Sequence, residues 1–261
     1  MIISKIRAKT ALGKSYIANY TINPYVGCSH ACRYCYADYY TKRIYGITHH
    51  WGEYVFIKEN LPQLLQNELI SKTPGTIYIS SLTDPYQPIE SQTKLTRTIL
   101  SILKEHDWPI IIQTKSALVR RDLDIFSLFS DVTVGFTIIT PKENIRCLLE
   151  PRASTIEARI SALKEIHNVG IKTYVFIGPI MPGTDFGDVL EIIERTQDYA
   201  DKFFFDKLNI KPNTWQNMRK FLGEEVTQKF ISSMKREYYA NIKNYIEEIM
   251  RKSKKPYQIL F

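Results

Sequence analysis

Short runs of β-branched and aromatic residues alternate along the chain with longer amphipathic runs. The short runs are typical of strands, and the amphipathic runs are typical of helices that bury one face. Strands are expected over residues 22–25, 76–80, 110–114, 132–138, 172–177 and 203–208. Helices are expected over residues 32–45, 61–71, 94–104, 123–129, 155–167 and 188–199.

This alternation indicates successive βα units and a parallel sheet, which places the chain in the α/β class. Six units suit an open (β/α)6 partial barrel of the TIM type. A flat doubly wound sheet produces a similar pattern and is the structural alternative. We expect one domain over residues 1–261, with the barrel core over roughly residues 18–210. Residues 224–252 are charged and lack strands, which predicts a C-terminal helical extension over about residues 211–261, packed across the barrel's open side.

Three of the four cysteines lie within eight residues, as Cys28, Cys32 and Cys35 in the spacing C-x3-C-x2-C. Soft thiolates select iron–sulfur clusters, zinc or copper(I), and three ligands on a four-iron cluster leave one iron open. A structural zinc site needs a fourth ligand, which His30 can supply. A disulfide framework fits less well, because no signal peptide is recognised and clustered cysteines in a cytosolic chain favour metal or catalysis. The spacing favours the cluster.

This run, with Tyr34 before its last cysteine, resembles the signature of radical S-adenosylmethionine (SAM) enzymes. The segments SLTDPYQP (81–88), QTKS (113–116), EPRA (150–153) and GPIMPG (178–183) follow in order. Together they resemble the branch related to spore photoproduct lyase, often labelled DNA repair photolyase-like. The resemblance implies a [4Fe-4S] cluster on the three cysteines, with SAM bound to its open iron. It also implies reductive cleavage of SAM to a 5'-deoxyadenosyl radical, with a ferredoxin or flavodoxin as electron donor.

Each motif lies at or just beyond the carboxyl end of an expected strand, the end at which an α/β barrel carries its active site. The reacting centre is expected at Ser81 and Asp84, where Asp84 can also close a turn before Pro85. The residues expected to bind SAM are Tyr34, Thr83, Lys115, Thr137, Thr140, Glu150, Arg152 and Gly178.

These residues have chemically distinct expected roles. Lys115 can pair with the SAM carboxylate, and Arg152 can bind a carboxylate through its fork. Glu150 can accept from ribose hydroxyls or an ammonium, although Glu150 and Arg152 can also form a structural ion pair. Gly178 lets the backbone approach a flat ring such as adenine.

Two positions bear on which reaction is expected. Ser81 stands where the resemblance places the hydrogen-donating cysteine of spore photoproduct lyase, and a hydroxyl is a far poorer hydrogen-atom donor than a thiol. Repair of spore photoproduct is therefore not expected. Cys147, the remaining cysteine, is expected to be a small buried hydrophobic residue.

Composition and charge narrow the class of protein further. An apolar fraction of 44% suffices for a sizeable core. No apolar stretch reaches the roughly 18 residues needed to span a bilayer, so we expect a soluble, cytoplasmic protein. The net charge of +8 favours an anionic partner, and nucleic acid is the first expected substrate class, although many basic enzymes bind none. The alternatives are radical modification of a peptide or small metabolite, and a non-catalytic zinc-bearing nucleic-acid-binding module.

Overall fold

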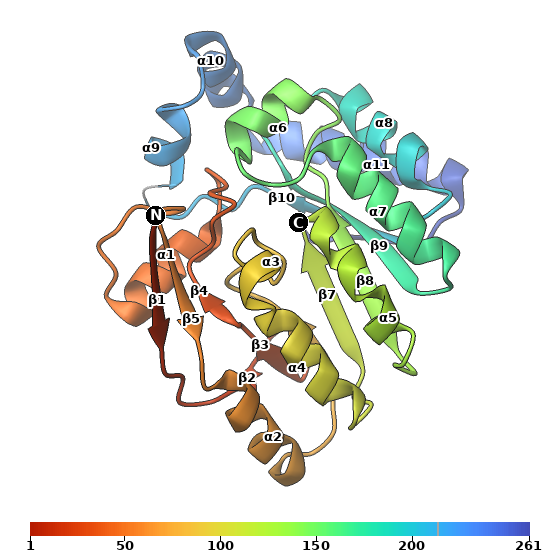
Figure 1. Ribbon diagram of the computed structural model, residues 1–261. Coiled ribbons are helices and arrows are strands. Elements are labelled where there is room, and N and C mark those ends of the chain that lie inside the picture. Colours follow the sequence, from red (N-terminus) through yellow and green to blue (C-terminus); the bar gives the residue numbers. More distant parts are fainter. Residues whose placement is uncertain (213) are drawn as a thin grey trace.

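The structure is a computed structural model that describes residues 1–212 and 214–261. Its main sheet has the strand order β11-β10-β9-β8-β7-β6-β3-β2 (Figure 1). Within it, β2 and β3 pair antiparallel, and the other neighbours pair parallel. The strands are β2 (Gly13–Lys14), β3 (Tyr20–Ile22), β6 (Ile77–Ile79), β7 (Ile110–Thr114), β8 (Val132–Thr137), β9 (Lys172–Ile180), β10 (Lys202–Lys207) and β11 (Tyr257–Ile259).

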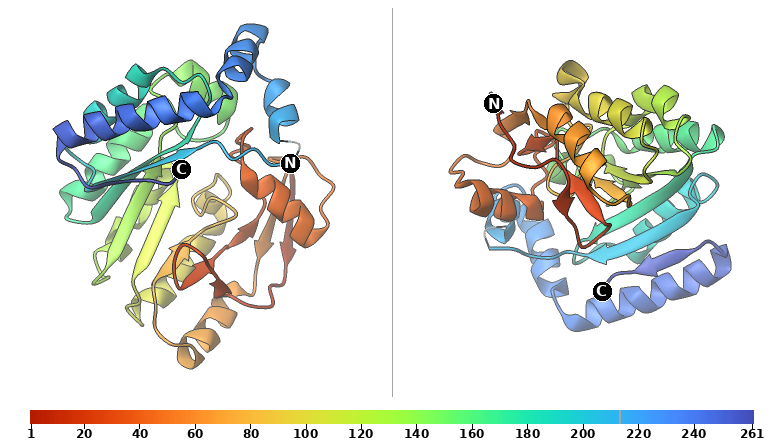
Figure 2. Two further views of the ribbon diagram at one scale, coloured as in Figure 1. Left: turned by 180° about the vertical axis from the view of Figure 1, so that it is seen from behind. Right: turned by 90° about the horizontal axis from the view of Figure 1, so that it is seen from below.

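From β3 to β11 the order of the strands in space follows their order in the chain. A doubly wound sheet instead reverses its order at a switch point, so the structure rules out that alternative. Because β2 and β11 lie at opposite edges, the sheet stays open. The further views show a curved wall with helices along its outside (Figure 2). The expected open partial barrel is confirmed.

Helices connect the parallel strands and cover the outer face of the sheet. In α4, for example, Leu95, Ile99 and Leu103 recur at four-residue spacing and are buried. The helices are α1 (Tyr36–Tyr45), α2 (Leu61–Ser71), α3 (Glu90–Thr93), α4 (Leu95–Lys104), α5 (Leu123–Phe126), α6 (Glu143–Leu149), α7 (Ile156–Asn168), α8 (Phe186–Thr196), α9 (Thr214–Arg219), α10 (Glu224–Ser233) and α11 (Arg236–Ser253), with a 3-10 helix at Ala117–Asp122. Among the described residues, no helix is both long and apolar enough to cross a membrane.

Side chains along each strand point alternately to an outer core, beneath the helices, and to an inner wall. On β10, Phe203 and Phe205 are fully buried in the core beneath the helices, so Phe204 lies on the inner face. Tyr174 of β9 is also on the inner face, and its ring centroid lies 5.2 Å from that of Phe204.

The N-terminal region departs from expectation. The expected strand 22–25 is divided into β3 and β4 (Tyr25–Val26). A second sheet, of order β1-β5-β4, joins β4 to β5 (Tyr54–Lys58) and β1 (Ile2–Ile6). The expected helix 32–45 begins only at Tyr36, because the preceding residues form the cysteine loop.

The C-terminal segment contains the expected helices, but α11 does not pack across the open side. It contacts α8 and contributes Ile242, Ile246 and Met250 to the main core. The chain then returns as β11, which pairs parallel with β10. A parallel return requires a crossover that covers one face of the sheet, which accounts for the position of α11.

Candidate active site at the carboxyl end of the sheet

The cysteine loop follows β4, and its first turn depends on a glycine. Gly27 has φ +88°, and a Cβ there would lie 2.4 Å from the Tyr54 carbonyl oxygen. Glycine alone meets both requirements without strain. Further along the loop, Ala31 N donates to the Cys28 carbonyl at 3.3 Å, and Cys35 N donates to the Cys32 carbonyl at 3.3 Å. These turns gather the three cysteines on one short segment.

The three thiols are free and close enough to influence one another. Cys28 and Cys32 are each 6% exposed. Burial, with smaller contributions from Asp84 and Cys35, raises the pKa of Cys28 to about 12. A metal must displace such protons when it binds. In the part of the chain that the structure describes, no three His, Cys, Asp or Glu side chains converge tightly enough to hold a single metal ion. Thiolates that each bind a different iron lie farther apart, and three soft donors in one buried loop fit a cluster.

Asp84 joins the cysteine loop to the ends of β6 and β7. Its Oδ1 accepts from Tyr86 N at 2.9 Å and from Thr114 Oγ1 at 2.7 Å, and its Oδ2 accepts from Lys115 N at 2.8 Å. His30 Nε2 lies 3.3 Å from Oδ2 without completing a hydrogen bond. Burial raises the pKa of Asp84, but His30 and these donors lower it by more, well below its usual range. The expected turn is confirmed, and a catalytic role for Asp84 stays a prediction.

Thr83 also supports the cysteine loop. Its hydroxyl donates to the Gly27 carbonyl at 2.7 Å and accepts from Gln87 Nε2 at 2.9 Å. Gln87 Oε1 in turn accepts from Ser29 N at 2.7 Å. The Thr83 hydroxyl therefore positions the cysteine loop. A contact between Thr83 and SAM stays a prediction.

Ser81 lies at the tip of β6, next to the first turn of α1. Its Oγ accepts from Thr21 Oγ1 at 3.2 Å and from Asn23 Nδ2 at 3.3 Å. Its carbonyl accepts from the Tyr36 hydroxyl at 2.6 Å. Tyr36 directly follows Cys35, so the structure brings the expected reacting centre close to the cysteine loop.

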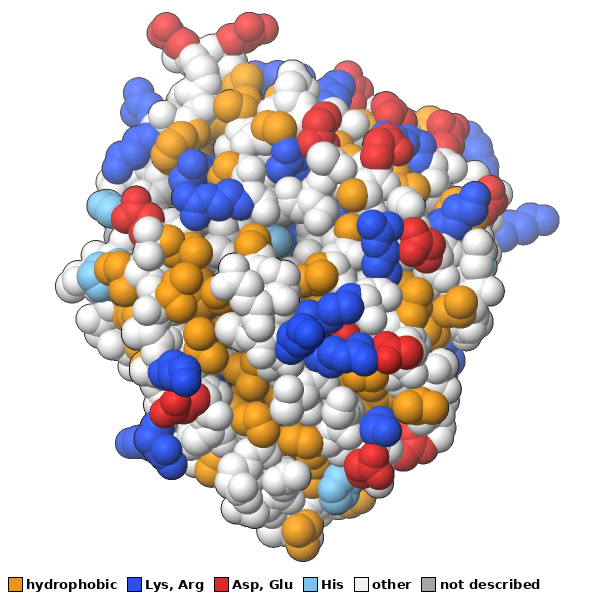
Figure 3. Space-filling model, viewed as in Figure 1, with side chains coloured by type: hydrophobic (Ala, Val, Ile, Leu, Met, Phe, Trp, Pro, Cys, Tyr) orange, Lys and Arg blue, Asp and Glu red, His pale blue; other side chains and the backbone are white. Residues whose placement is uncertain are grey.

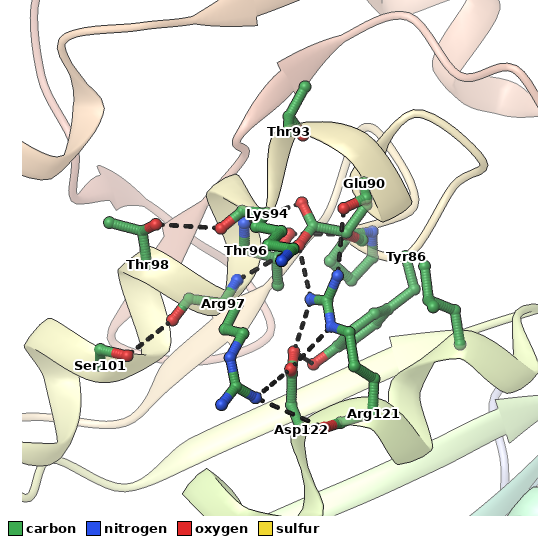
Figure 4. A network of polar contacts seen from close by, with 12 residues as sticks. Tyr86, Glu90, Thr93, Lys94, Thr96, Arg97, Thr98, Ser101, Arg121 and Asp122 are labelled. Atoms are coloured by element: carbon green, nitrogen blue, oxygen red, sulfur yellow. Dashed lines mark hydrogen bonds and ion pairs between the residues drawn. The ribbon is translucent and has the colours of Figure 1, made fainter.

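An ionic network holds the segment after Ser81 in place (Figure 4). Arg121 Nη2 lies 2.7 Å from Glu90 Oε1, and Arg97 Nη1 lies 2.7 Å from Asp122 Oδ1. The Tyr86 hydroxyl donates to Asp122 Oδ2 at 3.0 Å. Because Glu90 and Asp122 are fully buried, both need these partners. The network fixes the loop that carries Asp84.

A buried ion pair forms the wall beside Tyr34. Glu150 accepts from the Tyr34 hydroxyl through Oε1 and pairs with Arg159 Nη2 at 2.5 Å through Oε2. Both side chains of the pair are fully buried. Burial raises the pKa of Glu150, but Arg159 and Lys115 lower it by more, below its usual value.

The structure therefore separates Glu150 from Arg152. Arg152 is exposed, and its Nη1 donates to the Gly52 carbonyl at 2.7 Å. The alternative that Glu150 and Arg152 form a structural ion pair is wrong, because Arg159 takes that place, and the binding of SAM by both residues stays a prediction. Sequence reasoning missed Arg159, although its position three residues after Ile156 on the apolar face of α7 was a signal.

Lys115 lies on the inner face at the end of β7. Its Nζ is 5.8 Å from the centroid of the Tyr34 ring, and among the described residues no carboxylate oxygen lies within 4.0 Å of it. Burial lowers the pKa of Lys115, but Cys32, Glu150 and Cys35 raise it by more, above its usual value. Lys115 is therefore a cation free to pair with a ligand's carboxylate.

Thr137 and Thr140 lie at the end of β8 with different surroundings. Thr137 Oγ1 accepts from Gln113 Nε2 at 3.0 Å on the inner wall. Thr140 Oγ1 accepts from Lys142 N at 3.1 Å and lines a cavity of about 160 Å³. Other walls of this cavity come from the apolar cluster around Tyr34, including Ile139, Leu149, Met181, Met218, Leu222 and Phe230.

Two glycines of the inner wall make room for aromatic rings. A Cβ on Gly178 would lie 2.2 Å from the Phe176 ring, and a Cβ on Gly135 would lie 2.0 Å from the Tyr174 ring. The flat ring that Gly178 admits in this structure is thus Phe176, and an approach to adenine stays a prediction. Tyr174 was missed, although aromatic residues alternating with aliphatic ones along β9 mark an inner face.

Cys147 is exposed, so the expectation that it is buried is wrong. It lies on α6, whose buried residues are Arg146 and Leu149. Cys147 lies between these buried positions in the helix, and its side chain is exposed to solvent.

Comparisons with known proteins show which family and which relatives this chain resembles. The family model of the radical SAM superfamily matches residues 22–196. An uncharacterised protein of Methanocaldococcus jannaschii is 40% identical over 257 residues, which cover 97% of this chain and 93% of that protein. Spore photoproduct lyase of Clostridium acetobutylicum is 27% identical over 175 residues, which cover 62% of this chain and 47% of the lyase.

Solved structures show the same fold. A variant of spore photoproduct lyase with bound AdoMet and dinucleoside spore photoproduct matches with a TM-score of 0.71 and 13% sequence identity. The match covers 100% of this chain and 82% of the lyase chain. At that identity the likeness concerns the fold alone.

Proposed function

This chain belongs to the radical SAM superfamily, and from that premise we propose that it cleaves SAM reductively and uses the resulting radical to abstract hydrogen from a substrate. Membership implies an enzyme. The observation that carries the proposal is the placement of three clustered thiols, two of them buried, near Lys115, a cation with no carboxylate partner among the described residues. The comparisons give no support to a non-catalytic zinc-bearing module.

The chain's own residues divide into ligands and supports. Cys28, Cys32 and Cys35 would hold a [4Fe-4S] cluster, and Lys115 would pair with the carboxylate of SAM. When bound, the cluster and SAM supply the electron and the 5'-deoxyadenosyl radical. The protein orients these groups and excludes water. Asp84 keeps the cysteine loop in register with the ends of β6 and β7.

Nucleic acid is the substrate class that we propose. The net charge of +8 and the likeness in fold to a lyase solved with a dinucleoside support it. On the face shown in Figure 3, basic and acidic side chains are interspersed rather than gathered into one basic patch. A peptide or small metabolite is the second candidate class. A ferredoxin or flavodoxin as electron donor and a cytoplasmic location are further parts of the proposal.

We predict that the enzyme does not repair spore photoproduct efficiently, because Ser81 carries a hydroxyl in place of a hydrogen-donating thiol. The test incubates reduced, reconstituted enzyme with SAM and a dinucleotide that carries the lesion. Chromatography then measures thymine monomers and 5'-deoxyadenosine. We expect 5'-deoxyadenosine with little or no repair. Multiple-turnover repair at a rate unaffected by Ser81→Ala or Cys147→Ala would show that the missing thiol has been misinterpreted.

A further inference from the structure

The open side of the barrel has an inner wall that ends in a carboxylate. Phe203 and Phe205 of β10 are fully buried in the outer core, so Phe204 faces inward. The register on β9 shifts between Phe205 and Lys207, but Lys207 again lies against rings that pack on the outer core, so Asp206 faces inward. The contact between Phe204 and Tyr174 agrees with this direction. The Tyr174 hydroxyl reaches Gln113 Oε1 at 3.1 Å, deeper on the same wall. Asp206 therefore faces the interior near the carboxyl end of β10.

Asp206 forms no ion pair among the described residues. It is partly buried, and among the described residues no Lys, Arg or His nitrogen lies within 4.0 Å of its carboxylate. The neighbouring Lys207 points toward other rings, with its Nζ 5.7 Å from the centroid of Tyr239 and 5.9 Å from that of Phe261. Burial raises the pKa of Asp206, and the backbone N–H and the charge of Lys207 offset only part of that rise. A partly desolvated carboxylate without an ion-pair partner is costly, so a ligand that supplies a donor is favoured.

Two exposed rings lie on α1, the helix that follows the cysteine loop. Tyr36 is 44% exposed and Tyr40 is 37% exposed, with their ring centroids 6.1 Å apart. The Tyr36 hydroxyl is held on the Ser81 carbonyl, which places its ring beside the expected reacting centre. Burial raises the pKa of Tyr36 to about 12, and the charges of Cys35, Tyr40 and Asp206 add smaller contributions.

The segment after β10 reaches α1 and brings further positive charge. Lys211 Nζ lies 5.5 Å from the centroid of the Tyr40 ring. Seen from behind, this segment runs from β10 toward α1 above the strands (Figure 2, left). This part of the open side thus combines exposed rings, the cation of Lys211 and a carboxylate that forms no ion pair among the described residues.

These three features correspond to the three parts of a nucleotide. Exposed rings stack on bases irrespective of sequence, lysines attract phosphates, and a carboxylate accepts hydrogen bonds from the N–H groups of a base edge. A simple polyanion site would not place a carboxylate beside its cation. We propose that Asp206 is a specificity-determining residue that accepts a hydrogen bond from a nucleobase stacked against Tyr36. The inference rests on the proposed function and specifies the substrate as an unpaired base of a nucleic acid strand.

This inference is tested by measuring how Asp206→Ala changes the affinity for single-stranded DNA. A rise and a fall in affinity correspond to different roles of Asp206. The probes are a fluorescein-labelled decamer of mixed sequence and an abasic decamer of equal charge. Fluorescence anisotropy measures their affinity for reconstituted holoenzyme with SAM. If Asp206 only repels phosphates, its removal tightens binding of both probes. If Asp206 receives a base, the variant binds the decamer about tenfold or more weakly, and its affinity for the abasic probe does not fall.

Asp198→Ala is the matched control, because Asp198 is exposed in the turn between α8 and β10. We expect it to leave binding of the decamer unchanged. If Asp206→Ala lowers the melting temperature, the isosteric Asp206→Asn replaces it, with a smaller loss of the same sign expected. Unchanged or tighter binding of the decamer overturns the inference, as does equal affinity of the wild type for both probes. Formation of 5'-deoxyadenosine by the wild type in the same preparation shows separately whether the proposed function holds.

Discussion

Glu150 and Arg159 illustrate what one buried residue pair contributes to the site. The pair fixes Tyr34 through the Glu150 carboxylate. Arg159 also donates to the Thr137 carbonyl at 2.9 Å and to the Ser154 carbonyl at 3.0 Å. It therefore ties α7 to the end of β8 and to the loop that carries Arg152.

Arg159→Ala should destabilise the protein severely, because it leaves the Glu150 carboxylate buried and unpaired. Breaking a buried pair costs about 3–5 kcal/mol. The control is Arg120→Ala, which removes one partner of the exposed pair between Arg120 and Glu165 and should cost at most about 1 kcal/mol. Denaturant unfolding of the two variants measures the difference. Equal losses of unfolding free energy would show that the buried pair is not a structural anchor.

Lys115→Ala should weaken SAM binding without removing iron. Loss of a charge-assisted contact costs about 1.5–3 kcal/mol, which corresponds to about tenfold or more in affinity. Lys142→Ala is the control, since Lys142 is exposed and paired with Asp188. Equilibrium binding of SAM to reconstituted protein gives the affinities. Arg152→Ala provides a second variant, and unchanged affinity in both Lys115→Ala and Arg152→Ala would contradict the placement of SAM.

Local sequence motifs identify the site residues that lie within them. They do not identify residues whose role depends on a partner in another part of the chain. The cysteine run and Lys115 were found because each lies at a strand end within its own motif. Arg159 was missed because its partner, Glu150, precedes it on a different element. Asp206 was missed because a single carboxylate at the end of an aromatic strand carries no motif.

Among the secondary-structure elements, the parallel strands were the easiest to predict. Each of these strands is a run of aliphatic or aromatic residues buried by helices, such as β7 at Ile110–Thr114, which was predicted with its correct bounds. Strand β1 was missed because most of its residues are exposed. Strand β11 was missed because it has only three residues and follows a basic turn.

A larger residue at Gly135, on the inner face of β8, should destabilise the protein. Gly135→Ala would place a methyl group against the Tyr174 ring, and overpacking of this kind costs about 1–3 kcal/mol. Gly223→Ala is the control, because no atom lies within 4 Å of the added Cβ and its φ is −62°. That change should cost at most about 1 kcal/mol, because Gly223 is the N-cap of α10 and alanine is a poorer N-cap residue than glycine. If thermal unfolding finds the two variants equally stable, the inner wall is looser than the structure indicates.

For the whole molecule, the alternation of strands and helices was sufficient to predict an α/β fold, but not to choose between an open barrel and a doubly wound sheet. That choice depends on which strands pair, and strand order is absent from local patterns. The same limit explains α11. Its amphipathic sequence predicts a buried face, but its place beside α8 depends on the pairing of β11 with β10.

Formation of 5'-deoxyadenosine is the measurement that decides whether this molecule is the enzyme proposed. Anaerobically reconstituted, reduced protein is incubated with SAM, and the product is quantified together with iron per chain. We predict product from the wild type and from Cys147→Ala, and none from Cys28→Ala, Cys32→Ala or Cys35→Ala. Loss of iron in Cys147→Ala would contradict the ligand assignment. Iron-replete wild type that forms no 5'-deoxyadenosine would contradict the proposed function.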